Sequence, residues 1–230
     1  MNPKTKPKTP TDAELARTIT GARSYWFATA TRTGAMYRPR AESAALAVRA
    51  AHGLAPVPVH WIESPRRPGC DLRRWRDENG CLPLVRQLRG RLRRAAENTL
   101  APIRADAIAR YGTYLGYSVW DVLWPATTDK WIAHTGNRFE LGPYDAGWVA
   151  GALMAEAYGV RYNAADRATL QAHVESVRSC GPWVDSADAI HMMDMPVRIS
   201  LDDHQRLHGR PAIAWADGYS VDAEHGNVPL

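Results

Sequence analysis

The stretch that decides the fold lies near the end of the chain, from Pro196 to Pro229: PVRISLDDHQRLHGRPAIAWADGYSVDAEHGNVP. Apolar and polar residues alternate within it, with the period of two that is typical of a strand with one buried face. Turn-forming residues separate these runs, and Asp217-Gly218 suits the positive φ angles of a tight hairpin. The pattern predicts three short antiparallel strands, at residues 197–202, 212–215 and 219–222.

So small a sheet needs support from the rest of the chain, because three strands with one apolar face bury little surface. The residues before it are rich in helix signals, such as the capping-box spacing of Thr11 and Glu14 and the N-cap residue Asn163. Helices are predicted from residue 11, over 41–52, 102–124, 145–158 and 164–177, with one short strand at 57–62.

These elements predict an α+β protein, with a mostly helical body and a small antiparallel C-terminal β unit. We expect a single domain over residues 11–230, with the helical body at 11–190 and the β unit at 196–230. Residues 1–10 alternate lysine and proline with threonine and are predicted to be a disordered basic tail.

Composition narrows the class of protein. Hydrophobic residues make up 45% and charged residues 23% of the chain, which is the globular range. The formal net charge of +5 permits an acidic partner such as nucleic acid. No apolar leader or membrane-spanning run is found, and three cysteines without a CxxC pair argue against a disulfide framework. A cytoplasmic location and no membrane partner are therefore predicted.

Arginine is concentrated between Arg66 and Arg94, a segment that contains ten arginines and only three acidic residues. Leu84, Leu88 and Leu92 recur at helical spacing there, so the pattern predicts an amphipathic helix with its arginines toward water. Such a face either is simply solvated, or binds phosphates or an acidic protein surface. The candidate contact residues are Arg86, Arg89, Arg91, Arg93 and Arg94.

Histidines and carboxylates gather in the last 40 residues, which raises the possibility of a polar site. His208, Asp217 and His225 are the candidates, within a set that also holds His191, His204, Asp194, Asp202, Asp203 and Glu224. Turn chemistry explains the same residues, and their spacing matches no zinc signature, so no metal or cofactor is predicted. The cysteines are expected to be buried or inert.

Several segments carry a resemblance to a known family. The runs AGWVAGALMAEAYGV (146–160), VRSCGPWV (177–184), MPVRISLDDHQRLH (195–208), RPAIAWADGY (210–219) and EHGNVP (224–229) resemble domain of unknown function 6745, an uncharacterised bacterial family. AALAVRAAHGLAPVPVHWIESP (44–65) also resembles it, and the similarity is strongest over the C-terminal half. The family has extra residues where Gly209-Arg210 here joins His208 to Pro211. The resemblance implies no activity.

Three functional hypotheses follow. The first is a non-enzymatic macromolecule-binding or regulatory module, because no glycine-rich phosphate loop and no G-x-S-x-G elbow is found in the sequence. The second is a nucleic-acid-binding protein that uses the arginine-rich helix. The third is a metal-assisted hydrolase that uses the C-terminal His/Asp cluster. Whether the chain is an enzyme stays open, with the residues favouring a binding role.

Overall fold

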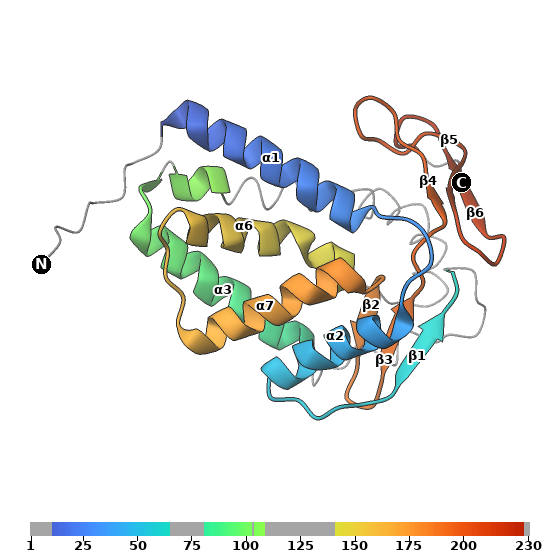
Figure 1. The fold of residues 1–230 in the computed structure, drawn as a ribbon, viewed down its shortest axis with the longest axis horizontal. Helices are drawn as coiled ribbons and strands as arrows, with labels where there is room; N and C mark the ends of the chain where they lie inside the picture. The colour runs from blue at the N-terminus through green and yellow to red at the C-terminus, as the bar shows by residue number, and fades with distance from the viewer. Residues whose placement is uncertain (1–10, 65–80, 103, 109–140, 228–230) are drawn as a thin grey trace, which may run out of the picture.

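A computed structural model describes residues 11–64, 81–102, 104–108 and 141–227 (Figure 1). The fold is α+β, as predicted, with several helices and two small sheets among the described residues. The predicted basic tail, Cys70 and most of the helix expected at 102–124 lie outside the described residues. None of the helices in the described ranges has both the length and the apolar character that a membrane span requires.

Two of the helices, α1 and α7, begin at the caps that the sequence predicts. Helix α1 (Asp12–Ala30) starts with the predicted capping box, in which Thr11 and Glu14 bond each other's backbone N–H groups. Helix α2 spans Arg38–Ala51, and α7 (Ala164–Ser179) starts with Asn163 accepting from the N–H of Asp166. A 3-10 turn η2 (Gly142–Asp145) leads into α6 (Ala146–Ala157).

Helix α6 is buried on most sides and forms the centre of the helical layer. It contacts α1, α7 and α3 (Cys81–Thr99), and Figure 1 shows it between α1 and the pair α3 and α7. Its run of alanine, glycine and valine permits this close approach, because small side chains let neighbouring helices pack on several faces.

The first sheet was not predicted as a sheet. It consists of β1 (Val59–Ile62), β2 (Trp183–Asp185) and β3 (Ile190–Met193) in the order β1-β3-β2, with β1 parallel and β2 antiparallel to β3. Only β1 was expected, and strands β2 and β3, which follow the last helix, were not predicted. Strands β2 and β3 are buried along their whole length, so they lack the alternation that identifies a strand in sequence.

The second sheet is the predicted C-terminal antiparallel unit. It contains β4 (Arg198–Ile199), β5 (Gly209–Ala214) and β6 (Ser220–Ala223), in the order β4-β5-β6. The first strand is shorter than predicted, and a single bridge between Leu201 and Leu207 closes the loop that follows it. The second strand is longer than the predicted 212–215, because β5 already begins at Gly209 and is irregular between Gly209 and Ile213.

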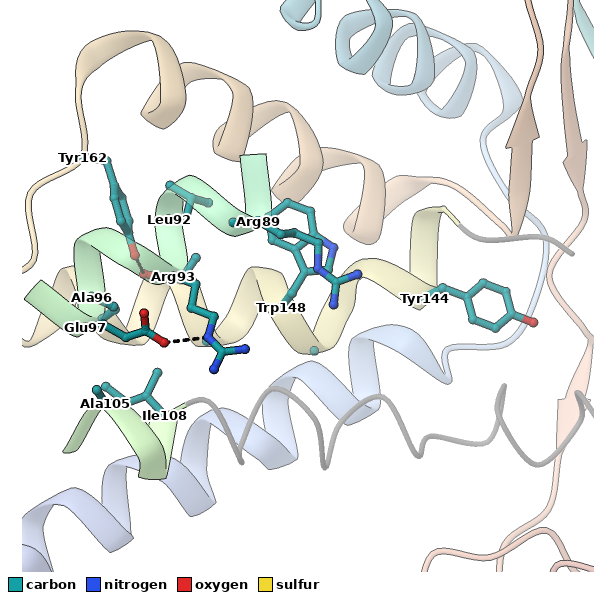
Figure 2. A pocket seen from close by; sticks show the side chains of 15 residues that line it. Arg89, Leu92, Arg93, Ala96, Glu97, Ala105, Ile108, Tyr144, Trp148 and Tyr162 are labelled. Carbon is teal, nitrogen blue, oxygen red and sulfur yellow. Dashed lines mark hydrogen bonds and ion pairs between the residues drawn. The ribbon is translucent and has the colours of Figure 1, made fainter. Parts of the chain in front are cut away.

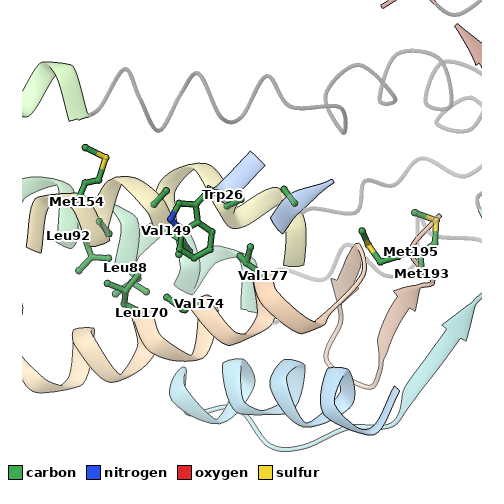
Figure 3. Packing of buried hydrophobic residues seen from close by; sticks show 14 of the residues in the cluster. Trp26, Leu88, Leu92, Val149, Met154, Leu170, Val174, Val177, Met193 and Met195 are labelled. Carbon is green, nitrogen blue, oxygen red and sulfur yellow. The ribbon is translucent and has the colours of Figure 1, made fainter. Parts of the chain in front are cut away.

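The terminal sheet shares one hydrophobic core with the helices. Figure 3 shows the helical part of this core, where Trp26, Val149 and Val177 meet between α1, α6 and α7. Buried residues of the sheet, including Ile213 of β5 and Val221 of β6, belong to the same cluster. The terminal sheet and the helices therefore contribute to one continuous cluster of buried apolar residues.

A buried ion pair fixes where α3 begins. Arg49, at the end of α2, bonds Asp185, at the end of β2, and both side chains are almost fully buried. The second carboxylate oxygen of Asp185 accepts the backbone N–H of Cys81 at 2.6 Å. One carboxylate thus links the first sheet, α2 and the N-terminus of α3.

Candidate functional site

Helix α3 has the amphipathic character that was predicted for it. Val85, Leu88 and Leu92 are buried, and Leu84 is half-buried. All five candidate arginines are exposed on the remaining surface: Arg86, Arg89, Arg91, Arg93 and Arg94. The leucine periodicity therefore identified the buried side of the helix correctly. We call the exposed arginines at 86, 89, 93 and 94 the arginine face.

Arg91 differs from the other four arginines because it forms an ion pair with a residue of another helix. Its guanidinium donates two hydrogen bonds to Asp166 of α7, at 2.9 and 2.7 Å. These bonds lower the pKa of Asp166, and they raise the pKa of Arg91. Among the described residues, Arg93 pairs with Glu97 one turn along the same helix, whereas Arg89 and Arg94 form no ion pair with a carboxylate there.

A cavity of about 560 Å³ opens beside the arginine face (Figure 2). Helix α3 supplies one wall, with Arg89 and Arg93 among its lining residues, and small residues of α6 supply another. Three aromatic residues also line it: Tyr144, Trp148 and Tyr162. Its volume is in the range of ligand pockets, about 300–1,000 Å³. Cationic side chains and aromatic rings therefore border the same space.

Two of these rings are held in place through their polar atoms. The Tyr162 hydroxyl donates to the carbonyl of Ala152 at 3.0 Å, and burial raises the pKa of Tyr162 to about 12. The Trp148 indole N–H donates to a carboxylate oxygen of Asp145 at 2.7 Å. Because their polar groups are satisfied within the protein, the rings line the cavity as fixed apolar surfaces.

Asp145 belongs to a buried hydrogen-bonded chain that the sequence did not reveal. Its other oxygen lies 3.1 Å from Nδ1 of His173, which is fully buried, and Nε2 of His173 lies 3.1 Å from Nε2 of His52. A carboxylate offers no donor, so His173 must donate through Nδ1, and its neutral form then accepts from His52. These hydrogen bonds join η2, α7 and the C-cap of α2.

The geometry of the two histidines is that of a hydrogen bond. Their ring centroids are 5.4 Å apart and the facing nitrogens 3.1 Å apart, so the nitrogens lie close to the line between the rings. Ligands of one metal ion would instead meet at an angle. Burial, followed by the charges of His173 and Arg91, lowers the pKa of His52 to about 4, which favours its neutral form at neutral pH.

The sequence did not predict this series of hydrogen bonds, because Asp145, His173 and His52 are distant in sequence and belong to different elements. One signal was present: His173 lies on the apolar stripe of α7 together with Leu170, Val174 and Val177. A histidine at such a position needs a buried hydrogen-bond partner. The sequence does not say that the partner is Asp145.

The C-terminal candidates are only partly brought together. The rings of His208 and His225 stack with their centroids 4.4 Å apart, and the N–H of His225 donates to Nδ1 of His208. The carboxylate beside them is Asp202, which accepts from His225 at 2.9 Å and from Arg206. These bonds, first that of His225, hold the pKa of Asp202 well below its usual range.

Asp217 lies elsewhere, in the turn between β5 and β6. One of its oxygens accepts from the backbone N–H of Tyr219 at 3.0 Å, and the other accepts from the hydroxyl of Ser64. Aspartate side chains in such turns commonly accept a hydrogen bond from the backbone two residues on, so the Asp217 carboxylate serves to stabilise its own turn. The three-residue grouping of His208, Asp217 and His225 is thus not the one that the structure assembles.

The described ranges contain no set of three or more His, Cys, Asp or Glu side chains arranged to hold a metal ion. The metal-assisted hypothesis therefore gains no geometric support from these residues. Cys81 and Cys180 are buried free thiols, and burial raises the pKa of both, to about 12 for Cys180. Thiols that stay protonated at neutral pH are poor nucleophiles.

Comparisons with protein-family models, curated proteins and solved structures found no match to this chain. The resemblance to domain of unknown function 6745 accordingly stays a prediction.

Proposed function

We propose that this chain is a non-enzymatic binding module, working in the cytoplasm, that recognises an acidic macromolecule through the arginine face of α3. The observation that carries the proposal is the exposure of Arg86, Arg89, Arg93 and Arg94 on one helix whose opposite side is buried. Several cations held on a rigid helix can neutralise several anionic groups at once.

The ion pairs of α3 also support this assignment. Arg91 pairs with a largely buried carboxylate of another helix, so its role is structural. The pair of Arg93 and Glu97 is exposed, with 72% and 47% of the two side chains accessible, and exposed pairs of this kind are weak in water. An acidic partner can therefore displace Glu97 and engage Arg93 at little cost.

Equilibrium binding of labelled heparin, a polyanion, tests the proposal. We expect the affinity to fall steeply between about 50 and about 200 mM salt, because binding releases counterions. Replacing Arg89, Arg93 and Arg94 with alanine should weaken binding by about tenfold or more, since charge-assisted contacts are the stronger class.

The matched control removes three exposed arginines from other elements, Arg17, Arg198 and Arg210, and so lowers the net charge equally. We expect this control variant to bind within a few-fold of the natural chain. Equal weakening by both triple variants would mean that net charge alone drives binding, and absence of binding by the natural chain would refute the proposal outright.

A further inference from the structure

The cavity beside α3 is lined by aromatic side chains as well as arginines, and electrostatic binding of a polyanion does not require aromatic side chains. Polyanion binding requires exposed cations, yet here Arg89 and Arg93 border a hollow whose other walls carry Trp148 and Tyr162 (Figure 2). Aromatic rings beside arginines form the combination that binds unpaired nucleobases, because any base can stack on a ring while its phosphate meets a guanidinium.

We propose that the acidic partner is single-stranded nucleic acid and that the cavity receives one of its unstacked bases. This inference rests on the proposed function, since the arginine face must hold the backbone of the strand. A duplex keeps its bases paired and stacked, so it could use the arginine face but not the cavity.

A strand fits the site better than a free nucleotide. The arginine face runs from Arg86 to Arg94, and eight residues of helix at about 1.5 Å each extend it for about 12 Å. Arg94 does not line the cavity, so it is available to a phosphate next to the inserted nucleotide. A single nucleotide would contact only part of this face.

The hydrogen-bonded chain behind the cavity gives the site a rigid wall. Asp145 holds the indole N–H of Trp148, and the His173 ring packs against the same indole with the centroids 4.9 Å apart. A ring fixed in this way loses little conformational freedom when a base contacts it, which favours binding. Asp145 and His173 are positioning residues in this account.

Two labelled oligonucleotides of equal length and charge separate the base from the backbone. One is oligothymidylate and the other carries abasic sugars throughout. We expect the natural chain to bind the thymidine strand about 5- to 150-fold more tightly, the range that stacking of one base supplies. Equal affinity for the two strands would overturn the inference.

Filling the cavity gives the second test. Ala96 of α3 is half-buried and lines the cavity, so Ala96→Leu should reduce thymidine binding to the level of the abasic strand and leave abasic binding unchanged. Ala95→Leu, at a half-buried neighbour that does not line the cavity, is the control. Ala105→Leu fills the same space from another wall if Ala96→Leu fails to fold.

The outcomes distinguish the two proposals. If both strands bind equally and binding depends on the arginines of α3, the proposed function holds and the cavity takes no base. If neither strand nor heparin binds, the proposed function itself fails. If both leucine variants fold and still prefer the thymidine strand, the base binds somewhere other than this cavity.

Discussion

Removal of the Asp145 carboxylate should destabilise the protein strongly, because two hydrogen-bond donors depend on this buried side chain. The indole N–H of Trp148 and Nδ1–H of His173 both donate to this side chain, which is 2% exposed. In Asp145→Ala each donor would lose its partner, at about 1–3 kcal/mol each. His173 can escape part of this cost by moving its proton to Nε2, so we expect a loss of about 3 kcal/mol.

Asparagine at this position gives a sharper comparison. Its amide oxygen can accept from Trp148 while its NH2 group donates to His173, provided that the histidine protons shift along the chain. Asp145→Asn would then keep both bonds and lose only their charge assistance, and we expect a cost of about 1 kcal/mol.

Urea unfolding at neutral pH, followed by circular dichroism, measures both variants, and a thermal scan should show Asp145→Ala melting about 6–12 °C lower. An alanine variant within about 0.5 kcal/mol of the natural chain would refute the buried-donor argument. An asparagine variant as unstable as the alanine variant would refute the shifted-proton explanation.

Two further predictions concern pH and backbone packing. The pKa values of His52 and His191 are lowered to about 4, first by burial, so their stabilising contribution is complete above about pH 6.5 and is lost as pH falls toward 4. The urea midpoint should therefore decline between pH 6.5 and 4.5, and less so when both histidines are replaced by glutamine; a midpoint that stays constant would contradict this. Gly181→Ala should destabilise by about 3 kcal/mol or more, because its Cβ would lie 1.9 Å from the carbonyl oxygen of Met193, whereas Gly21→Ala on open helix surface should stabilise by about 0.5–1 kcal/mol. Unfolding of the two variants tests this, and similar stabilities would refute the close-approach argument.

The sequence predicted elements whose signals are local. The capping box at Thr11, the cap at Asn163 and the leucine spacing of α3 depend on residues within a few positions of one another, and the structure confirms each. The alternation in the C-terminal stretch likewise predicted an antiparallel sheet, although β4 proved shorter than its pattern suggested.

What the sequence could not predict depends on contacts between distant residues. The pairing of β1 with β3 joins Val59 to Ile190, and short strands buried on both sides resemble any apolar run. The chain from Asp145 to His52 needs three elements to meet. Similarly, the choice of Asp202 over Asp217 beside His225 follows from the return of the chain after β6, where the N–H of Gly226 bonds the carbonyl of Leu207.

The most direct test of the central claim is to map which arginines a polyanion protects. Modification of the full chain by phenylglyoxal, read by mass spectrometry with and without heparin, reports the accessibility of each arginine. The account predicts protection of Arg86, Arg89, Arg93 and Arg94, with Arg17 and Arg198 unchanged. Protection spread evenly over all exposed arginines, or confined to arginines outside α3, would contradict it.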